Sequence, residues 1–67
     1  MKRGSELDLG DVVVFPGERH HYRIYGIDAK RPFLGAISGR TLWVEAVSPD
    51  AYKLIVTVED EAEYATE

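Results

Sequence analysis

Apolar and polar side chains alternate in short segments that follow one another along the chain. In the clearest segment, Arg40–Val47, one face carries Leu42, Val44 and Ala46 and the other carries Thr41, Trp43, Glu45 and Val47. A period of two residues is typical of a strand with one buried face. Four further strands are predicted on the same grounds, at Asp11–Phe15, His20–Ile27, Phe33–Ile37 and Tyr52–Val58. No window has apolar residues at helical spacing over the roughly ten residues that a stable helix needs.

The same alternation predicts the core. In the second strand, the face with Tyr22, Ile24 and Gly26 is a better core candidate than the face with His21, Arg23, Tyr25 and Ile27. In the last strand, the core side is expected to carry Tyr52, Leu54, Val56 and Val58.

Turn residues separate these strands. Phe15-Pro16-Gly17-Glu18 predicts a type II turn, because proline presets one φ angle and glycine tolerates the positive φ that follows. Ser38-Gly39 predicts a two-residue hairpin turn. Ser48-Pro49-Asp50 predicts the next turn, with room for one turn of 3₁₀ helix through Tyr52.

Five short strands with tight turns need closure, because an open small sheet leaves exposed edges. We therefore expect an all-β fold, a five-stranded antiparallel small barrel or roll formed by residues 9–58 as a single domain. Residues 1–8 are expected to be flexible, and residues 59–67 are expected to form a frayed acidic tail. The alternative is an α+β roll in which the tail forms a short helix.

Several segments resemble the layout of SH3-like small β-barrels. They are Gly10-Asp11-Val12-Val13 in the first strand, Tyr25-Gly26-Ile27 in the second, Leu42-Trp43-Val44 in a later strand, and the link from Ser48 to Tyr52. The resemblance covers roughly residues 9–58 and implies a binding module. The acidic loop and paired tyrosines of signalling SH3 domains are not recognisable, and the glycine pattern of KOW segments is not matched.

Charge is segregated along the chain, whose formal net charge is −4. Residues 19–40 carry +4, from Arg19, Arg23, Lys30, Arg31 and Arg40 against Asp28. Residues 59–67 carry −5. Basic residues interleaved with aromatic ones can bind a phosphate backbone or an acidic protein surface.

The predicted binding site is a basic aromatic face. Its residues are Arg19, His21, Arg23, Tyr25, Arg40 and Trp43. Aromatic and arginine side chains are the usual anchors of an interface, and aromatic rings beside a basic groove can stack bases. The plainer alternatives are that Trp43 plugs an open end of the barrel, that the arginines are solvated, and that the acidic tail only confers solubility.

Catalytic and metal chemistry find no support in the sequence. The chain has no cysteine, which excludes disulfides and thiolate ligands. His20 and His21 are adjacent on a strand, so they point to opposite faces and do not chelate one metal together. The serines lie at turns or termini, and no glycine-rich phosphate loop is present. We expect no enzyme activity, no cofactor and no metal.

The sequence therefore predicts a non-catalytic protein-interaction module, a small regulator or accessory factor. The net negative charge favours a protein partner, because long-range repulsion opposes binding to nucleic acid. The alternative is a nucleic-acid-binding barrel whose acidic tail competes for the same face. A homodimer through an outward Trp43 and Val47 is a further possibility. No apolar run approaches a membrane span, and we expect a cytoplasmic protein.

Overall fold

The computed structural model describes residues 1–28, 38–49 and 51–67. These residues form six strands: β1 Lys2–Arg3, β2 Val12–Val14, β3 His21–Asp28, β4 Gly39–Ala46, β5 Lys53–Glu59 and β6 Glu63–Thr66. A 3₁₀ helix, η1, spans Gly4–Glu6, and the described ranges contain no α-helix. The expectation of an all-β protein is confirmed for this part of the chain. The strand predicted at Phe33–Ile37 lies outside the described residues.

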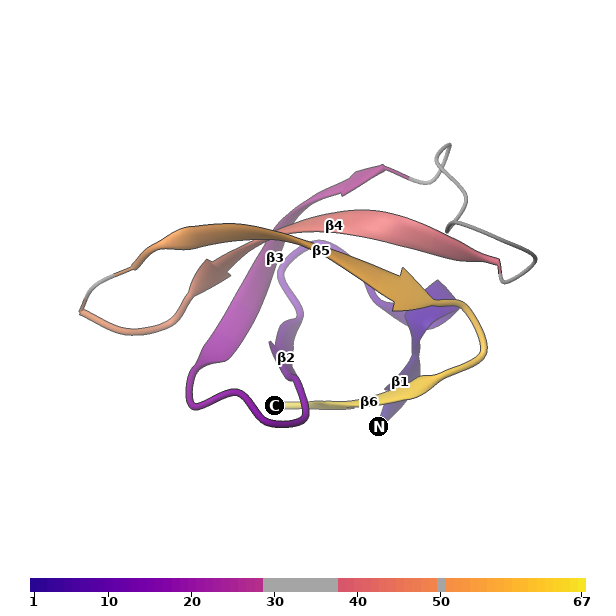
Figure 1. The fold of residues 1–67 in the computed structure, drawn as a ribbon, viewed down its shortest axis with the longest axis horizontal. Coiled ribbons are helices and arrows are strands. Elements are labelled where there is room, and N and C mark those ends of the chain that lie inside the picture. Colours follow the sequence, from indigo (N-terminus) through magenta and orange to yellow (C-terminus); the bar gives the residue numbers. More distant parts are fainter. Residues whose placement is uncertain (29–37, 50) are drawn as a thin grey trace.

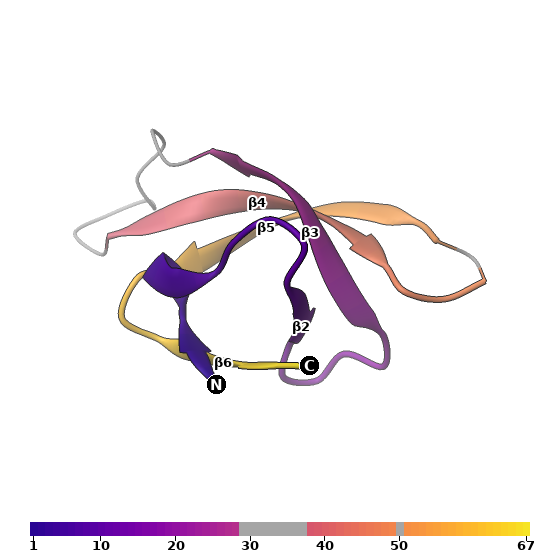
Figure 2. The ribbon, with the colours of Figure 1, turned by 180° about the vertical axis from the view of Figure 1, so that it is seen from behind.

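The strands form one sheet in the order β1-β6-β2-β3-β4-β5, and all the pairings are antiparallel. Strands β2 to β5 are neighbours in chain order, whereas β6 returns to lie between β1 and β2. The sheet curls, so that β1 and β6 come back beneath β5 (Figures 1 and 2). The result is an open, barrel-like sheet of six strands rather than the five that were predicted.

The core lies on the inner face of this curled sheet. Its buried residues are Leu7, Val13, Tyr22, Ile24, Leu42, Val44, Ala46 and Val58. The predicted inward faces of β3 and β4 are therefore confirmed at Tyr22, Ile24, Leu42, Val44 and Ala46. In β5, Val58 is buried and Leu54 and Val56 pack against the core. Tyr52, which was predicted on the same core side, precedes β5 and is 39% exposed.

A β-bulge changes the face of β3 at Tyr25. Ile24 pairs with Val44, but the next pair is Gly26 with Trp43, so two residues of β3 lie opposite one residue of β4. Beyond the bulge, Ile27 packs against the core. Gly26 pairs with outward-facing Trp43, so its assignment to the core face is wrong. A glycine within a strand pattern can mark a bulge, but the alternation around Gly26 does not show which residue is the extra one.

The expectation of loose ends is also wrong. Strand β6 pairs with β1 and β2. The sequence predicted a frayed acidic tail or a short helix in this segment. The ring of Tyr64 lies 5.8 Å from that of Phe15, and the Tyr64 hydroxyl accepts the backbone N–H of Glu59 at 3.2 Å. At the other end, Leu7 is only 2% exposed. A single apolar side chain, Leu7 or Tyr64, packs each end against the rest of the fold. Segments this short have no alternation of apolar and polar residues from which a strand could be predicted.

The predicted turn at Pro16-Gly17 is confirmed. Gly17 has a φ of +81°, and the N–H of Glu18 donates to the carbonyl of Phe15 at 3.1 Å. A comparable turn closes at Gly10, where φ is +88° and the N–H of Asp11 donates to the carbonyl of Asp8 at 3.1 Å. The two turns set the directions in which the chain enters β2 and β3.

Candidate binding surface

The outer face of β3, β4 and β5 carries several of the predicted site residues. Cross-strand pairing aligns Arg23 with Glu45, and Glu45 with Lys53. The next outward row aligns Gly26 with Trp43, and Trp43 with Ile55. Residues opposite each other on one face of an antiparallel pair have side chains within contact distance. The outer face therefore has a charged row beside an apolar one.

Trp43 lies over Gly26. A methyl group at Gly26 would lie 3.1 Å from Cε3 of Trp43 and 3.3 Å from its Cβ. The indole therefore covers the bare backbone of a strand glycine, a pairing that protects an otherwise weak point of a sheet. Trp43 is partly buried in this position and lies outside the buried core, so it does not plug the barrel from within.

Tyr25 lies on the same surface, two residues after Arg23 on β3. The Lys53 ammonium lies 5.3 Å from the centroid of the Tyr25 ring, within the range of a cation–π contact. Tyr25 is 46% exposed and Ile55 is 68% exposed. We call Arg23, Tyr25, Trp43, Lys53 and Ile55 the outer patch. It combines two cations with an exposed apolar and aromatic surface.

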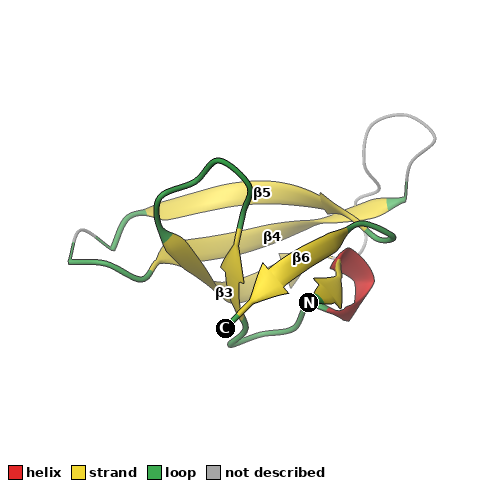
Figure 3. Ribbon diagram, turned by 90° about the horizontal axis from the view of Figure 1, so that it is seen from below, coloured by secondary structure: helices red, strands yellow, loops and turns green. Residues whose placement is uncertain are grey.

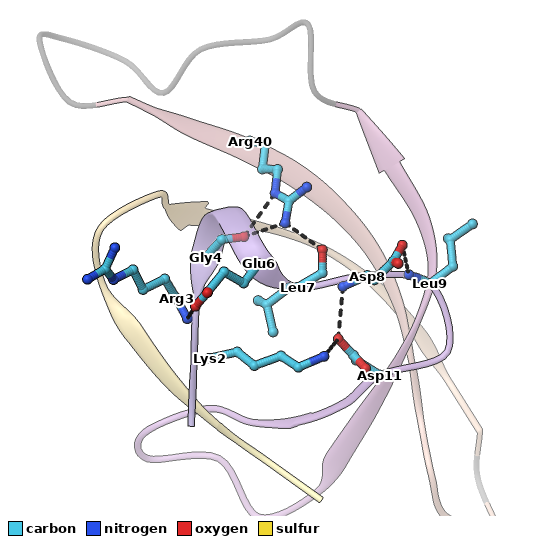
Figure 4. A network of polar contacts seen from close by, with 9 residues as sticks. All are labelled: Lys2, Arg3, Gly4, Glu6, Leu7, Asp8, Leu9, Asp11 and Arg40. Atoms are coloured by element: carbon cyan, nitrogen blue, oxygen red, sulfur yellow. Dashed lines mark hydrogen bonds and ion pairs between the residues drawn. The ribbon is translucent and has the colours of Figure 1, made fainter.

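Arg40 does not belong to this surface. Its guanidinium donates from Nε to the carbonyl of Gly4 at 2.9 Å, and from Nη2 to the carbonyl of Leu7 at 2.5 Å (Figure 4). Arg40 lies on the same face of β4 as Leu42 and Val44, because the three residues occupy alternate positions of the strand. Its grouping with Arg23, Tyr25 and Trp43 is therefore wrong, because this arginine binds backbone inside the fold.

The segment that Arg40 holds is itself tied to the sheet. Lys2 Nζ donates to Asp11 Oδ2 at 3.0 Å, and the N–H of Asp8 donates to the same oxygen at 2.9 Å (Figure 4). Partial burial opposes ionisation of Asp11, but these hydrogen bonds and the Lys2 charge outweigh it and lower the pKa of Asp11. The carboxylate is thus an ionised anchor for the N-terminal segment.

The two remaining predicted residues, Arg19 and His21, precede or begin β3. Arg19 is exposed in the bend before β3. His21 begins β3, and its Nδ1 contacts the Glu67 carboxylate in a half-exposed pair. Two further basic residues of the central segment, Lys30 and Arg31, lie outside the described residues. The structure therefore brings Arg23, Tyr25 and Trp43 together and separates them from Arg19 and Arg40.

Tyr22 anchors the inner face at the opposite end of β3 from the bulge. Its hydroxyl lies 2.7 Å from that of Tyr52 and donates to Glu18 Oε1 at 3.2 Å. The hydrogen bond with Tyr52, together with desolvation and the nearby Glu18 charge, raises the pKa of Tyr22. His20 packs edge-on against Tyr52, with centroids 5.7 Å apart. These contacts are structural, since they join two loops to the core.

An open hollow of about 370 Å³ lies between the end of β2 and β6. Phe15 and Tyr64 provide apolar walls, and Glu18 and Glu63 add two carboxyl groups. The charge of these carboxylates opposes binding of a phosphate or another anion. The hollow therefore does not extend the basic face.

Sequence reasoning missed Lys53 and Ile55 as surface contributors. The signal was present, because the predicted core side of the last strand was the even-numbered one, which leaves Lys53, Ile55 and Thr57 facing outward. Their nearness to Trp43 and Tyr25 depends on the pairing of β5 with β4 and of β4 with β3. Neither is visible in local sequence.

Residues Glu63–Thr66 of the acidic C-terminal segment form a strand of the sheet, β6. Residues Ala65 and Thr66 pair with β2, and the N–H of Glu67 donates to the carbonyl of Val12 at 2.9 Å. Because β6 is held on both sides, it is not a free arm that moves over the outer patch. The predicted competition by a flexible tail loses its structural basis.

In the described part of the chain, no group of three or more His, Cys, Asp or Glu side chains is placed to hold a metal ion. Among the same residues, no helix has the length and apolar character that crossing a membrane requires. Comparisons with protein-family models, curated proteins and solved structures find no match to this chain. Functional inference therefore rests on the surface itself.

Proposed function

We propose that this protein is a non-catalytic interaction module, a small regulator or accessory factor that binds another protein through the outer patch of an SH3-like barrel. The observation that carries the proposal is the outward row formed by Trp43 and Ile55, next to Tyr25 and two cations. Such a surface combines apolar anchors with charges that select a partner. The order β6-β2-β3-β4-β5 is compatible with the SH3-like resemblance.

The chemistry of the patch favours a partner with an apolar centre and acidic groups around it. Arg23 and Lys53 provide two cations that lie on either side of Glu45. Side chains such as Leu or Phe would cover Ile55, while Asp or Glu would pair with the flanking cations.

A nucleic-acid partner is less well supported. Affinity for a phosphate backbone depends on the number of cations that neutralise phosphates. Arg40 is engaged inside the fold, Glu45 interrupts the basic row, and the chain carries a net charge of −4. We therefore retain nucleic acid as an outcome of the test rather than as a second proposal.

The test is affinity capture from nuclease-treated and untreated host lysate. The immobilised proteins are the wild type, Arg23→Glu, Tyr25→Ala and the control Arg3→Glu, which reverses an exposed charge on β1. We expect a protein that survives nuclease treatment, binds wild type and Arg3→Glu, and is lost with both patch variants. Equal capture by all four proteins would remove the outer patch from consideration. Recovery that disappears with nuclease would support the nucleic-acid alternative.

A further inference from the structure

Strand β5 ends the sheet in the described part of the chain, where β4 is the one strand beside it (Figure 3). The carbonyl of Tyr52 accepts the N–H of Ala46 at 2.9 Å, and the N–H of Asp60 donates to the carbonyl of Ser38 at 2.9 Å. Backbone groups alternate in direction along a strand. Even-numbered residues of β5 therefore bond to β4, and odd-numbered residues direct their N–H and C=O groups to the open edge.

The open edge is limited at one end. The N–H of Glu59 is taken by the Tyr64 hydroxyl, and Gly4 of η1 packs directly against the Glu59 carbonyl. Lys53, Ile55 and Thr57 remain, and among the described residues no backbone hydrogen bond reaches their edge-facing N–H and C=O groups. An edge with unpaired groups and β-branched side chains is a template for another strand.

We propose that this edge pairs with the same edge of a second copy of the chain, in an antiparallel arrangement with Ile55 opposite Ile55. Lys53 then lies opposite Thr57 of the second copy, and the reverse pair forms by symmetry. Each opposing pair exchanges N–H···O bonds in both directions, because both residues direct their backbone groups to the edge.

The register follows from the backbone. A shift by one residue in the pairing would place odd residues opposite even ones, whose groups already bond to β4. Centring the pair on Val56 would require the edge of Glu59, which is occupied. Centring it on Ile55 uses the whole available segment.

The side chains of the second copy are complementary in this register. Ile55, which is 68% exposed, meets its symmetry mate on the outer face. Lys53 lies diagonal to Glu59 of the second copy, within reach of a long side chain, and like charges do not oppose each other. This self-complementarity favours a second copy over an unrelated strand.

In the dimer the two-fold axis is perpendicular to the sheet, as antiparallel pairing of two identical edges requires. The outer faces of the two copies therefore lie on the same side of the joined sheet and form one surface. The two outer patches would then be adjacent at Ile55. The contact is small, so we expect a dissociation constant of roughly micromolar or weaker. The inference does not depend on a partner for the outer patch.

The test is sedimentation equilibrium of the full chain from about 10 µM to about 1 mM, a range chosen for a weak interface. Thr57→Pro removes an edge N–H without affecting a bond to β4. Ile55→Lys places like charges on the two-fold axis. We expect each to raise the dimer dissociation constant by about tenfold or more. The control Val47→Lys, at an exposed residue after β4 that is 45% accessible, should dimerise like wild type.

Amide hydrogen exchange supplies a second readout. In the dimer, the amides of Lys53, Ile55 and Thr57 should become protected as concentration rises, while the even-numbered amides of β5 are protected throughout. A wild-type protein that stays monomeric at the highest concentration would overturn the proposal. So would a dimer that persists in both edge variants, or protection of the odd amides that does not change with concentration.

Discussion

Arg23 and Arg40 lie on neighbouring strands of one sheet, but their side chains serve different ends. Arg23 extends from the outer face of β3 and is exposed. Arg40 is on the inner face of β4 and donates to the carbonyls of Gly4 and Leu7. The two side chains project from opposite faces of the sheet. A residue type therefore indicates a binding site only once its face is known.

The same contrast separates two larger regions. Around Arg40, backbone carbonyls, Lys2 and Asp11 form a polar network that holds the N-terminal segment to the sheet. Around Arg23, the outer patch leaves Tyr25 and Ile55 open to solvent. A polar group that is buried away from water lowers the free energy of unfolding when its hydrogen-bond partner is removed. An exposed polar group that loses its partner binds water instead, at little cost. Substitutions in the first region should affect stability, and those in the second should affect binding.

The largest effect is expected from removing β6. Deletion of residues 63–67 removes the strand between β1 and β2 and the Tyr64 ring that packs against Phe15. We expect the truncated protein to lose its cooperative urea transition, as followed by circular dichroism. Glu63→Ala, which alters only an exposed side chain of the same strand, should keep the transition. A truncated protein with an unchanged urea midpoint would show that β6 contributes nothing to stability.

The next effect is expected from Arg40→Met. This variant keeps much of the apolar stem but leaves the carbonyls of Gly4 and Leu7 without their donor. Loss of hydrogen bonds to a charged group predicts a cost of about 2–4 kcal/mol in the free energy of unfolding. The matched variant Arg23→Met should stay within about 0.5 kcal/mol. Equal midpoints in urea for the two variants would contradict the contrast between the arginines.

A smaller effect is expected from Gly4→Ala. A methyl group at Gly4 would overlap the backbone carbonyl of Glu59, which belongs to the end of β5 and has little freedom to move. Overpacking of this kind predicts a cost of about 1–3 kcal/mol. Ser5→Ala changes the adjacent, exposed residue and should have little effect. Thermal unfolding of both variants distinguishes a close backbone contact from a general sensitivity of η1.

The smallest effect is confined to alkaline pH. The pKa of Tyr22 is raised in the folded protein, so above the ordinary tyrosine pKa of about 10 the unfolded state loses this proton first. Stability is therefore expected to fall as the pH rises above that value. Tyr22→Phe should lessen this decline in urea midpoints measured between about pH 8 and pH 11. Tyr25→Phe, which removes a hydroxyl from the outer patch, is the control. If both variants lessened the alkaline loss of stability equally, the decline could not be assigned to Tyr22.

The sequence by itself determined the positions of four strands, the inward face of β4, that of β3 as far as Ile24, and the Pro16-Gly17 turn. These depend on local alternation and on φ preferences, which neighbouring residues reveal. The face of Arg40 was also readable, because it shares the parity of Leu42.

Only the tertiary structure decided the rest. The acceptors of Arg40 lie more than thirty residues away along the chain, at Gly4 and Leu7. The bulge at Tyr25 inserts one residue, which reverses the faces of β3 beyond it. The pairing of β4 with both β3 and β5 brings Lys53 to Tyr25. Strand β6 is stabilised by β1 and β2 rather than by its own pattern. Such pairings join distant segments, and their free energy is absent from any local window of sequence.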